Sequence, residues 1–386
     1  MPKAPWLLAA GTLLALAGPA AADDSGTFFV RLGRDTTGVE HYSRTASRIE
    51  IDQVGRVPRV LRRHFVYDLD AKGDITKISI VVTRPGAPAG APPIQTLTGA
   101  LAGDSLAIES RRDTTVTKTK AYLPPGTVLV AGMPWTAFEG MSTELAASKA
   151  DSLRRAELFL GLATLAHITV RRFAPDSVAI ETATDRYRVA VDKTGRIQHV
   201  TPIFGTQQYT VDRVSDMDLD KVAADFLARE QAAGQMGALS TRDTVKVSTG
   251  GAALWIDYGR PARRGRSIFG MVVPFGRVWR TGANAATQFK TDKALQIGAT
   301  TVPAGFYTLW TIPEADGWKL VVNSETGQWG TEHKPEKDLY TVAMTVSPIP
   351  QPVERFTITV EPSAHGGVLN MDWDTTRASV PFIVKP

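Results

Sequence analysis

The chain has 386 residues, a formal net charge of +5 and no cysteine. The absence of cysteine excludes disulfides, a thiolate nucleophile, and zinc or iron–sulfur sites with cysteine ligands. With 43% hydrophobic and 22% charged residues, the composition is that of a globular protein of more than one domain, and the mild positive charge does not by itself indicate a nucleic-acid partner.

The first 22 residues have the pattern of a secretory signal peptide. Lys3 supplies a positive charge, residues 6–17 are apolar, and three alanines end at Ala22 before Asp23. The apolar run is shorter than the about 20 residues that span a bilayer, and no cysteine follows it. We therefore expect cleavage after Ala22 and a periplasmic or extracellular protein that is not a lipoprotein and has no transmembrane segment after cleavage. A retained membrane anchor is the alternative. Loss of Lys3 lowers the formal charge from +5 to +4.

From residue 27 onward the sequence predicts antiparallel β-strands, in segments rich in Val, Ile, Phe and Tyr that alternate apolar with polar residues. These segments span residues 27–35, 38–44, 47–54, 61–70 and 74–84, and further ones lie between 167 and 214. A D-x-x-G-x-I pattern predicts a hairpin turn at Asp70 and Gly73, and again at Asp192 and Gly195. The repeat fits two related halves of one sheet, or simply two hairpins.

Two segments predict helices. Residues 142–165 are rich in Ala, Leu, Glu and Arg with apolar residues at helical spacing, and a second helix is expected over 217–234. The second helix and the small polar residues after it mark a domain boundary. We therefore expect a β-rich N-terminal domain over 23–214, an antiparallel β-sheet or half-barrel with a helix, followed by a helical linker over 215–240.

Residues 241–386 predict a second β-domain, so that the fold class is mainly β. Ten short candidate strands are separated by Gly and Pro turns, with hardly any helix. Six tryptophans lie in this part of the chain, at positions 255, 279, 310, 318, 329 and 373. The pattern favours an antiparallel β-sandwich.

Positive charge is concentrated in residues 259–287, which contain six arginines, five glycines and no acidic residue. Arginine offers a planar fork that fits a carboxylate or phosphate, and glycine allows a backbone to approach a ligand closely. One interpretation is therefore a surface that binds an anionic or saccharide-like ligand. The other is a brace, in which the arginines hydrogen-bond the carbonyls of their own loop. We expect residues 268–276 to be buried, and Arg263 and Arg264 to be solvated.

The C-terminal domain resembles a known family. The segments YGRPARRGRSIFGMVVPFGRVWRTGANAATQF, VPAGFYTLWTIP, NSETGQWG, MDWD and VPFIV follow one another in the order typical of the bacterial secreted family DUF2911, a domain of unknown function. The resemblance covers residues 241–384 and implies an extracytoplasmic β-rich domain. It implies no activity, substrate or catalytic residue, and the N-terminal domain resembles no family that we can name.

The resemblance is concentrated at particular positions. These are Tyr258, Gly259, Arg260, Pro261, Gly265, Arg266, Trp279, Arg280, Thr281, Gly282, Ala283, Asn284, Ala304, Gly305, Tyr307, Trp329 and Gly330. One departure is that His333 and Lys334 stand where the family more often has a Tyr-Asp pair, which puts any role of that tyrosine in doubt here.

Motifs for catalysis and metal binding are weak. None of the six histidines has metal-ligand spacing, and no G-x-S-x-G or P-loop pattern is present. Asp372 and Asp374 lie two apart on one predicted strand and could serve glycoside hydrolysis or bind Ca²⁺, although a solvated strand end explains them as well. We expect neither a cofactor nor a metal site.

Three functions stay open. The first is a non-enzymatic binding module of the cell envelope for an anionic or saccharide-like ligand, with site residues Arg260, Arg266, Trp279, Arg280, Asn284 and Trp329. The second is a structural domain that docks on an envelope protein partner. The third is a hydrolase of envelope polysaccharide or peptide that draws its carboxylates from Asp257, Asp338, Asp372 or Asp374. Nucleic acid is not expected as a partner, because the signal sequence directs the protein away from it and the aromatic residues are not interleaved in any RNA-binding pattern.

Overall fold

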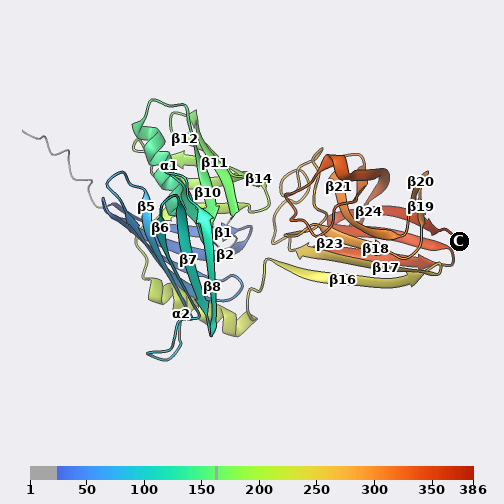
Figure 1. The fold of residues 1–386 in the computed structure, drawn as a ribbon, viewed down its shortest axis with the longest axis horizontal. Coiled ribbons are helices and arrows are strands. Elements are labelled where there is room, and N and C mark those ends of the chain that lie inside the picture. The colour runs from blue at the N-terminus through green and yellow to red at the C-terminus, as the bar shows by residue number, and fades with distance from the viewer. Residues whose placement is uncertain (1–23, 161–163) are drawn as a thin grey trace, which may run out of the picture.

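The computed structural model describes residues 24–160 and 164–386, so the predicted signal peptide lies outside the described residues. Two sheets, one in each half of the chain, account for most of the structure, together with two α-helices and one 3-10 turn (Figure 1). The mainly β fold predicted from the sequence is confirmed.

The N-terminal sheet has 15 strands in the order β8-β7-β6-β5-β4-β3-β2-β1-β15-β14-β13-β12-β11-β10-β9. Neighbouring strands are antiparallel except β9 and β10. The sheet is open, with β8 and β9 as its edges. Its strands are β1 (Asp24–Leu32), β2 (Asp35–Arg44), β3 (Arg48–Gly55), β4 (Leu61–Leu69), β5 (Ile75–Thr83), β6 (Gln95–Ala102), β7 (Ser105–Arg112), β8 (Thr115–Tyr122), β9 (Val128–Val130), β10 (Ser152–Phe159), β11 (Thr164–Ala174), β12 (Ser177–Glu181), β13 (Asp185–Val191), β14 (Ile197–Gly205) and β15 (Tyr209–Val214).

Helix α1 (Trp135–Ala147) fills the concave side of this sheet, between its two wings (Figure 1). Trp135, Phe138 and Leu145 share one buried core with apolar residues from both wings. The start of the helix is held by Glu40 of β2, whose carboxylate accepts hydrogen bonds from the Thr136 amide (2.7 Å) and hydroxyl. The half-barrel with a helix is therefore the observed arrangement.

The two D-x-x-G-x-I turns are built in the same way. In each, one aspartate oxygen accepts two backbone amides, from Lys72 and Asp74 at Asp70, and from Thr194 and Arg196 at Asp192. The glycine of each turn has φ +85°, a conformation that disfavours residues with a side chain. The first turn joins β4 to β5 and the second β13 to β14, so both predicted hairpins are confirmed.

The predicted helix over 142–165 is correct only as far as Ala147, and the observed helix begins earlier, at Trp135. Helix α1 ends at Ala147, and residues 152–159 form β10, which pairs with β9 on one side and β11 on the other. Residues 161–163 lie outside the described part of the chain. Pairing with strands on both sides outweighs the high helix propensity of Leu, Arg, Ala and Glu in this segment.

Helix α2 (Leu219–Ala233) occupies the segment expected as a linker. It packs Leu219, Val222 and Phe226 against Val39 and Val54 of the N-terminal sheet. Asp218 caps its first turn by accepting the amides of residues 220 and 221.

The C-terminal sheet has nine strands in the order β16-β17-β18-β21-β22-β23-β24-β19-β20. The long strand β23 pairs with β22 through its first residues and with β24 along the rest, so the sheet folds over as two layers of a sandwich around one apolar core. Its strands are β16 (Ser240–Thr249), β17 (Ala252–Pro261), β18 (Thr287–Thr291), β19 (Leu295–Ile297), β20 (Thr300–Val302), β21 (Gly305–Pro313), β22 (Trp318–Asn323), β23 (Asp338–Ser363) and β24 (Gly366–Val384), with a 3-10 turn at Pro335–Lys337.

Candidate functional site

The basic segment connects β17 to β18 and lies at the junction of the two domains. Two backbone hydrogen bonds cross there, from the Gly205 amide to the Met271 carbonyl (3.0 Å) and from the Arg34 amide to the Arg264 carbonyl (3.2 Å). Ile268, Val272 and Val273 are buried in the sandwich core, but Phe275 is 45% exposed, so the expected burial of residues 268–276 is only partly confirmed.

Arg264 is buried, contrary to the expectation from the sequence, and Arg263 is half-buried. Arg264 is only 8% exposed. Its guanidinium donates to Asp35 of β2 (2.8 Å) and to the Met236 carbonyl (3.3 Å). Arg263 lies 3.0 Å from Asp374. The expectation fails because the partners of Arg264 come from the other domain, which a local charge pattern does not reveal.

Two of the predicted site residues, Arg260 and Arg266, act as braces. Arg266 donates to the backbone carbonyls of Ala262, Arg263 and Thr206, so that it also joins the two domains. Arg260 donates to the Phe356 carbonyl, to Asp243 and to the Thr357 hydroxyl. Their nitrogens are therefore engaged within the protein.

The two predicted tryptophans lie in different surroundings. Trp279 is buried in the sandwich core, where its ring stacks on Trp373 (centroids 5.9 Å apart) and meets Phe356 edge-on at 5.0 Å. Trp329 is 42% exposed and forms a backbone bridge with Ala285.

A cavity of about 140 Å³ lies between the domains. Four predicted site residues line it, namely Arg266, Trp279, Arg280 and Asn284, whereas Arg260 and Trp329 do not. The other lining residues are Leu32, Thr206, Gln207, Tyr209, Leu239, Ser240, Pro261, Val272, Gly282, Ala283 and Trp373. The site thus combines both domains, and its N-terminal residues are not indicated by any sequence motif.

Arg280 differs from the other arginines of the cavity. Its Nε is buried without a hydrogen-bond partner, and within the described part of the chain its guanidinium forms neither a hydrogen bond nor an ion pair. Burial lowers the pKa of Arg280, and the charge of Asp185 partly offsets this effect. The side-chain stem is held by close contact with Gly330, where a Cβ would lie 2.0 Å from the Arg280 Cδ.

Asp185, at the start of β13, is the acidic group behind the cavity. It is 5% exposed and accepts hydrogen bonds from the Gln207 amide (2.6 Å) and the Thr184 hydroxyl. Burial raises the pKa of Asp185, while these hydrogen bonds and the charges of Arg280 and Arg266 oppose the rise. Asp185 is thus influenced by the charges of both Arg280 and Arg266, and the charges of Arg264 and Glu354 act on Arg266 as well.

Asn284 lies on the rim of the cavity. It has φ +63°, a region that asparagine tolerates better than most residues. Its backbone carbonyl accepts the Gly330 amide (2.9 Å), while its side-chain amide has no hydrogen-bond partner among the described residues. The exposed amide of Asn284 and the half-buried guanidinium of Arg280 are therefore free to contact a ligand.

The four carboxylates considered for hydrolysis all have protein partners. Asp257 pairs with Arg242 (2.7 Å), Asp372 takes two hydrogen bonds from Arg377 (2.8 and 2.7 Å), and Asp374 lies beside Arg263. These three are held within the fold.

Asp338, the fourth carboxylate, is the partner of His333, one of the two residues that stand where the DUF2911 family more often has a Tyr-Asp pair. The His333 Nε2 lies 2.9 Å from Asp338, and the imidazole packs on Trp310 with centroids 4.8 Å apart. Asn323 also donates to Asp338 (2.7 Å). The histidine thus holds the 324–337 loop against the sheet, and none of the four carboxylates lines the junction cavity.

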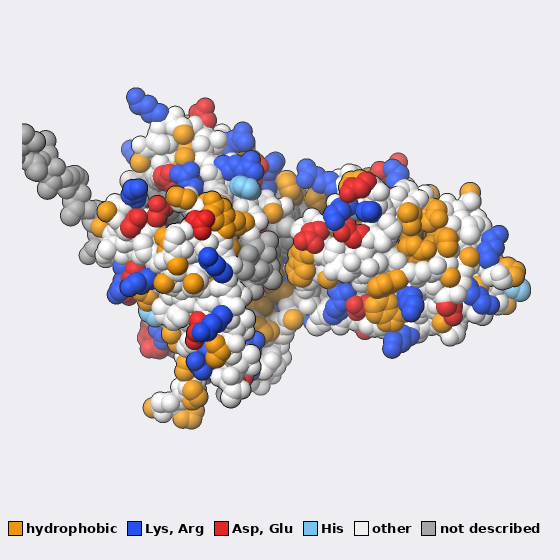
Figure 2. Space-filling model, in the orientation of Figure 1, with side chains coloured by type: hydrophobic (Ala, Val, Ile, Leu, Met, Phe, Trp, Pro, Cys, Tyr) orange, Lys and Arg blue, Asp and Glu red, His pale blue; other side chains and the backbone are white. Residues whose placement is uncertain are grey.

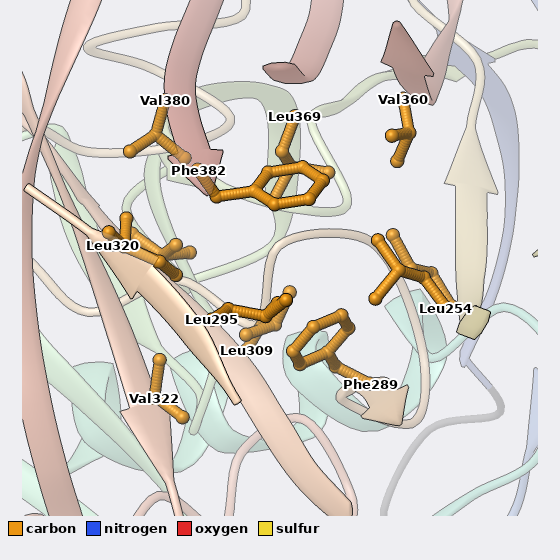
Figure 3. A pocket seen from close by; sticks show the side chains of 12 residues that line it. Leu254, Phe289, Leu295, Leu309, Leu320, Val322, Val360, Leu369, Val380 and Phe382 are labelled. Carbon is orange, nitrogen blue, oxygen red and sulfur yellow. The ribbon is translucent and has the colours of Figure 1, made fainter. Parts of the chain in front are cut away.

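A second cavity lies inside the C-terminal sandwich (Figure 3). Side chains such as Leu254, Phe289, Leu320 and Phe382 point into it, all lining residues are apolar, and its volume is about 20 Å³. A space of this size without polar partners is a packing gap rather than a ligand site.

Comparison with known proteins gives two distant structural similarities. A crystal structure of a β-barrel-like protein of domain of unknown function DUF1849 from Brucella abortus is 14% identical, with a TM-score of 0.34, over 50% of this chain and 97% of that chain. A structure concerned with the cell entry of botulinum neurotoxin type C is 8% identical, with a TM-score of 0.13, over 94% of this chain and 89% of that one. Neither similarity is strong enough to support an argument.

The family match concerns the C-terminal domain. No curated protein matches the chain. Among residues 24–160 and 164–386, no helix has the length and apolar character needed to cross a membrane. The family comparison agrees with the motifs: residues 240–382 match the model of the family described as "Protein of unknown function (DUF2911)", whereas the N-terminal region matches no family model.

Proposed function

We propose that this protein is an exported, non-enzymatic binding module that takes a small anionic ligand in the cavity between its two domains. The single observation that supports this most is Arg280, whose half-buried guanidinium has no acceptor among the described residues. A planar guanidinium pairs with a carboxylate or phosphate through two parallel hydrogen bonds. Arg280 is the proposed anchor, and the Asn284 amide is a second contact on the rim.

The energetics favour a charged ligand over a neutral one. A buried polar group without a partner costs about 1–3 kcal/mol, and more when it is charged. A ligand anion at Arg280 would remove this cost and would gain a charge-assisted hydrogen bond. The guanidinium group of Arg266 adds positive charge beside Arg280, and the carboxyl groups of Asp185 and Glu354 offset part of it.

The size of the cavity restricts the ligand. Its volume of about 140 Å³ is below the roughly 300–1,000 Å³ of pockets that enclose drug-sized molecules. A small carboxylate or phosphate monoester group therefore fits better than a whole saccharide. The exposed Trp329, bridged to Ala285 near Asn284, could stack on a sugar that carries such a group, so a sugar acid is the second candidate.

Two other functions have weaker support. A docking domain would be favoured by one wide apolar patch, but Figure 2 shows separate orange patches over this face of the sandwich. The exposed large apolar residues there come from different segments, among them Phe275, Phe306, Leu339 and Ile383. A hydrolase would need free carboxylates, and all four candidates are held by protein partners.

Export is also part of the proposal. It is supported by the residues before Asp23, which follow the charged, apolar and small-residue order of a signal peptide. Amino-terminal sequencing of the protein from a periplasmic extract or culture supernatant tests it, and the expected first residue is Asp23. A cytoplasmic protein that keeps Met1–Ala22 would contradict it.

The binding proposal is tested by calorimetric titration of the mature protein with acetate, inorganic phosphate, glucuronate and neutral glucose. We expect at least one anion to bind and glucose not to bind. Arg280→Met should weaken anion binding about 10- to 100-fold, the equivalent of about 1.5–3 kcal/mol. The matched control is Arg277→Met, because Arg277 is an exposed arginine of the same loop outside the cavity lining. Equal binding by wild type and Arg280→Met, or no binding of any anion at millimolar concentration, would overturn the proposal.

A further inference from the structure

The geometry points to a second binding site, independent of the junction cavity: we propose that the interior of the half-barrel beside α1 binds a single-chain amphiphile with an anionic head group. The site is a cavity of about 470 Å³, within the range typical of small-molecule pockets. It lies where α1, the ends of β3 to β5 and the β9–β10 pair meet.

The inner wall of this cavity is apolar. Ile51, Tyr67, Leu129 and Met141 line it and are themselves buried in the N-terminal core. The partly buried Ile49, Leu69 and Ile75 continue the apolar wall toward the rim. Since apolar surface is driven out of contact with water, an alkyl chain is the occupant that this wall favours.

The rim of the cavity carries unpaired positive charge. Three cations and two acids stand there, namely Arg44, Lys72, Arg155, Asp74 and Glu144. Arg155 pairs with Glu144, and Asp74 accepts the Gly126 amide (2.7 Å). Neither Arg44 nor Lys72 has a carboxylate partner among the described residues.

Arg44 is the better placed of these two cations. It donates to the Thr136 carbonyl at the start of α1 (3.2 Å), and its Nε is buried without a hydrogen-bond partner. A carboxylate or phosphate head group at the rim would supply the missing acceptor. The charge on the rim therefore selects an anion, while the wall behind it selects an alkyl chain.

The apolar path continues beyond this cavity. A neighbouring hollow of about 280 Å³ shares Asp74, Ile75, Gly126 and Thr127 with it. That hollow is lined by the apolar Leu101, Tyr122, Leu123, Pro124 and Pro125 and also by Asp70, Gly103 and Asp104, and Tyr122 is 54% exposed. Because Asp74, Ile75, Gly126 and Thr127 line both spaces, a chain longer than the inner cavity can extend along the apolar residues of the second one.

A peptide is a poorer occupant than an alkyl chain. Strands β3, β4 and β5 are interior strands of the sheet, each paired on both sides. Their backbone groups are already hydrogen-bonded to neighbouring strands, so the amides of an inserted peptide would stay without partners in an apolar space. An alkyl chain has no such groups.

The experiment uses the full mature chain, delipidated, with dodecanoate, octanoate and dodecyltrimethylammonium as probes below their micelle concentrations. Calorimetry and native mass spectrometry should show one dodecanoate per chain, at least tenfold weaker binding of octanoate, and at least tenfold weaker binding of the cationic amphiphile. Dodecanoate that fails to bind, or binds no better than the cation of equal chain length, would overturn the proposal.

Matched variants locate the site. Ala137→Phe fills the cavity from α1 and should abolish dodecanoate binding, whereas Ala147→Phe, at an exposed position of the same helix outside the lining, should leave it unchanged. Arg44→Gln and Lys72→Gln should each weaken dodecanoate binding several-fold. If Arg44→Gln fails to fold, Lys72→Gln still tests the contact with the head group, because Lys72 is exposed. Full dodecanoate binding by a folded Ala137→Phe protein would exclude this cavity.

Because Arg280 lies in the other cavity, Arg280→Met should bind dodecanoate normally even if anion binding at the junction fails.

Discussion

Gly330 contacts Arg280 so closely that a Cβ on Gly330 would lie 2.0 Å from the Arg280 Cδ and 2.4 Å from the Asn284 carbonyl oxygen. The WG dipeptide of the NSETGQWG segment and the RTGAN segment, which are nearly 50 positions apart, thus meet at the proposed anion site. Residue 330 has to be glycine, because the Arg280 side chain and the Asn284 carbonyl both lie where a Cβ would be.

Gly330→Ala should therefore displace the Arg280 side chain. We expect anion binding at the junction to fall at least tenfold, and the free energy of unfolding to fall by about 1–3 kcal/mol, the usual cost of overpacking. Titration and urea denaturation measure the two effects. Gly317→Ala is the control, since no atom lies within 4 Å of its Cβ position. If Gly330→Ala binds anions like the wild type, Arg280 is not positioned by this contact.

The ion pair between Arg264 and Asp35 should couple the two domains. Arg264→Ala removes a buried contact of 2.8 Å and leaves Asp35 without its partner, so we expect a loss of about 2 kcal/mol. We also expect faster proteolysis between the domains. Arg34→Ala is the comparison, because its side chain is 70% exposed and 4.0 Å from Glu354, and exposed pairs contribute about 0–1 kcal/mol. Equal proteolysis rates for the two variants would show that Arg264 does not couple the domains.

Much of the fold follows from the sequence, because short-range patterns determine it. The alternation of apolar and polar residues indicates the strands, and the Asp70 and Asp192 turns form the same local hydrogen bonds that their pattern predicts. The sequence pattern does not predict strands β6 to β8 and predicts a helix at β10, because these strands are stabilised by pairing with neighbouring strands rather than by a clear alternation of apolar and polar residues.

The candidate site was only partly predictable, for the same reason. The family motifs indicated Arg280 and Asn284, which line the junction cavity. The motifs do not show that Arg266 is hydrogen-bonded within the protein whereas Arg280 is not. One acceptor of Arg266, the Thr206 carbonyl, belongs to the other domain. Asp185 and Tyr209 carry no motif, and only the packing of the domains brings them to the site.

The two predicted tryptophans should respond differently to truncation. Trp279→Ala removes a ring packed on Trp373 and Phe356 in the core, so we expect a loss of about 3–5 kcal/mol. Trp329→Ala, at a half-exposed position, should cost less than about 1 kcal/mol. Chemical denaturation followed by fluorescence measures both. A small loss for Trp279→Ala would contradict its assignment to the core.

The buried carboxyl groups should make the protein less stable as the pH rises toward neutrality. Burial raises the pKa of Glu157 to about 7, and the charge of Asp185 adds to the rise; burial likewise raises the pKa of Glu40 to about 7, although its hydrogen bonds oppose it. Both groups have an ordinary pKa of 4.5. Between these values the folded protein binds more protons than the unfolded chain, so the free energy of unfolding falls as pH rises from about 4.5 to 7 and levels off above. Each group contributes about 3 kcal/mol at most.

The variant Glu157→Gln tests whether Glu157 causes this decrease of the free energy of unfolding with rising pH. Glu157 has an Oε2 without a hydrogen-bond partner, so a neutral amide removes the titration while keeping the shape of the side chain. We expect the variant to be less stable than the wild type, or equal to it, near pH 5 and to lose less stability on going to pH 7.5, as measured by urea denaturation at each pH. The exposed Glu144→Gln should keep the wild-type slope. A Glu157→Gln protein with the full wild-type slope would show that this carboxyl group ionises in the folded state as it does in water, and the pH dependence would then have to come from Glu40 and Asp185.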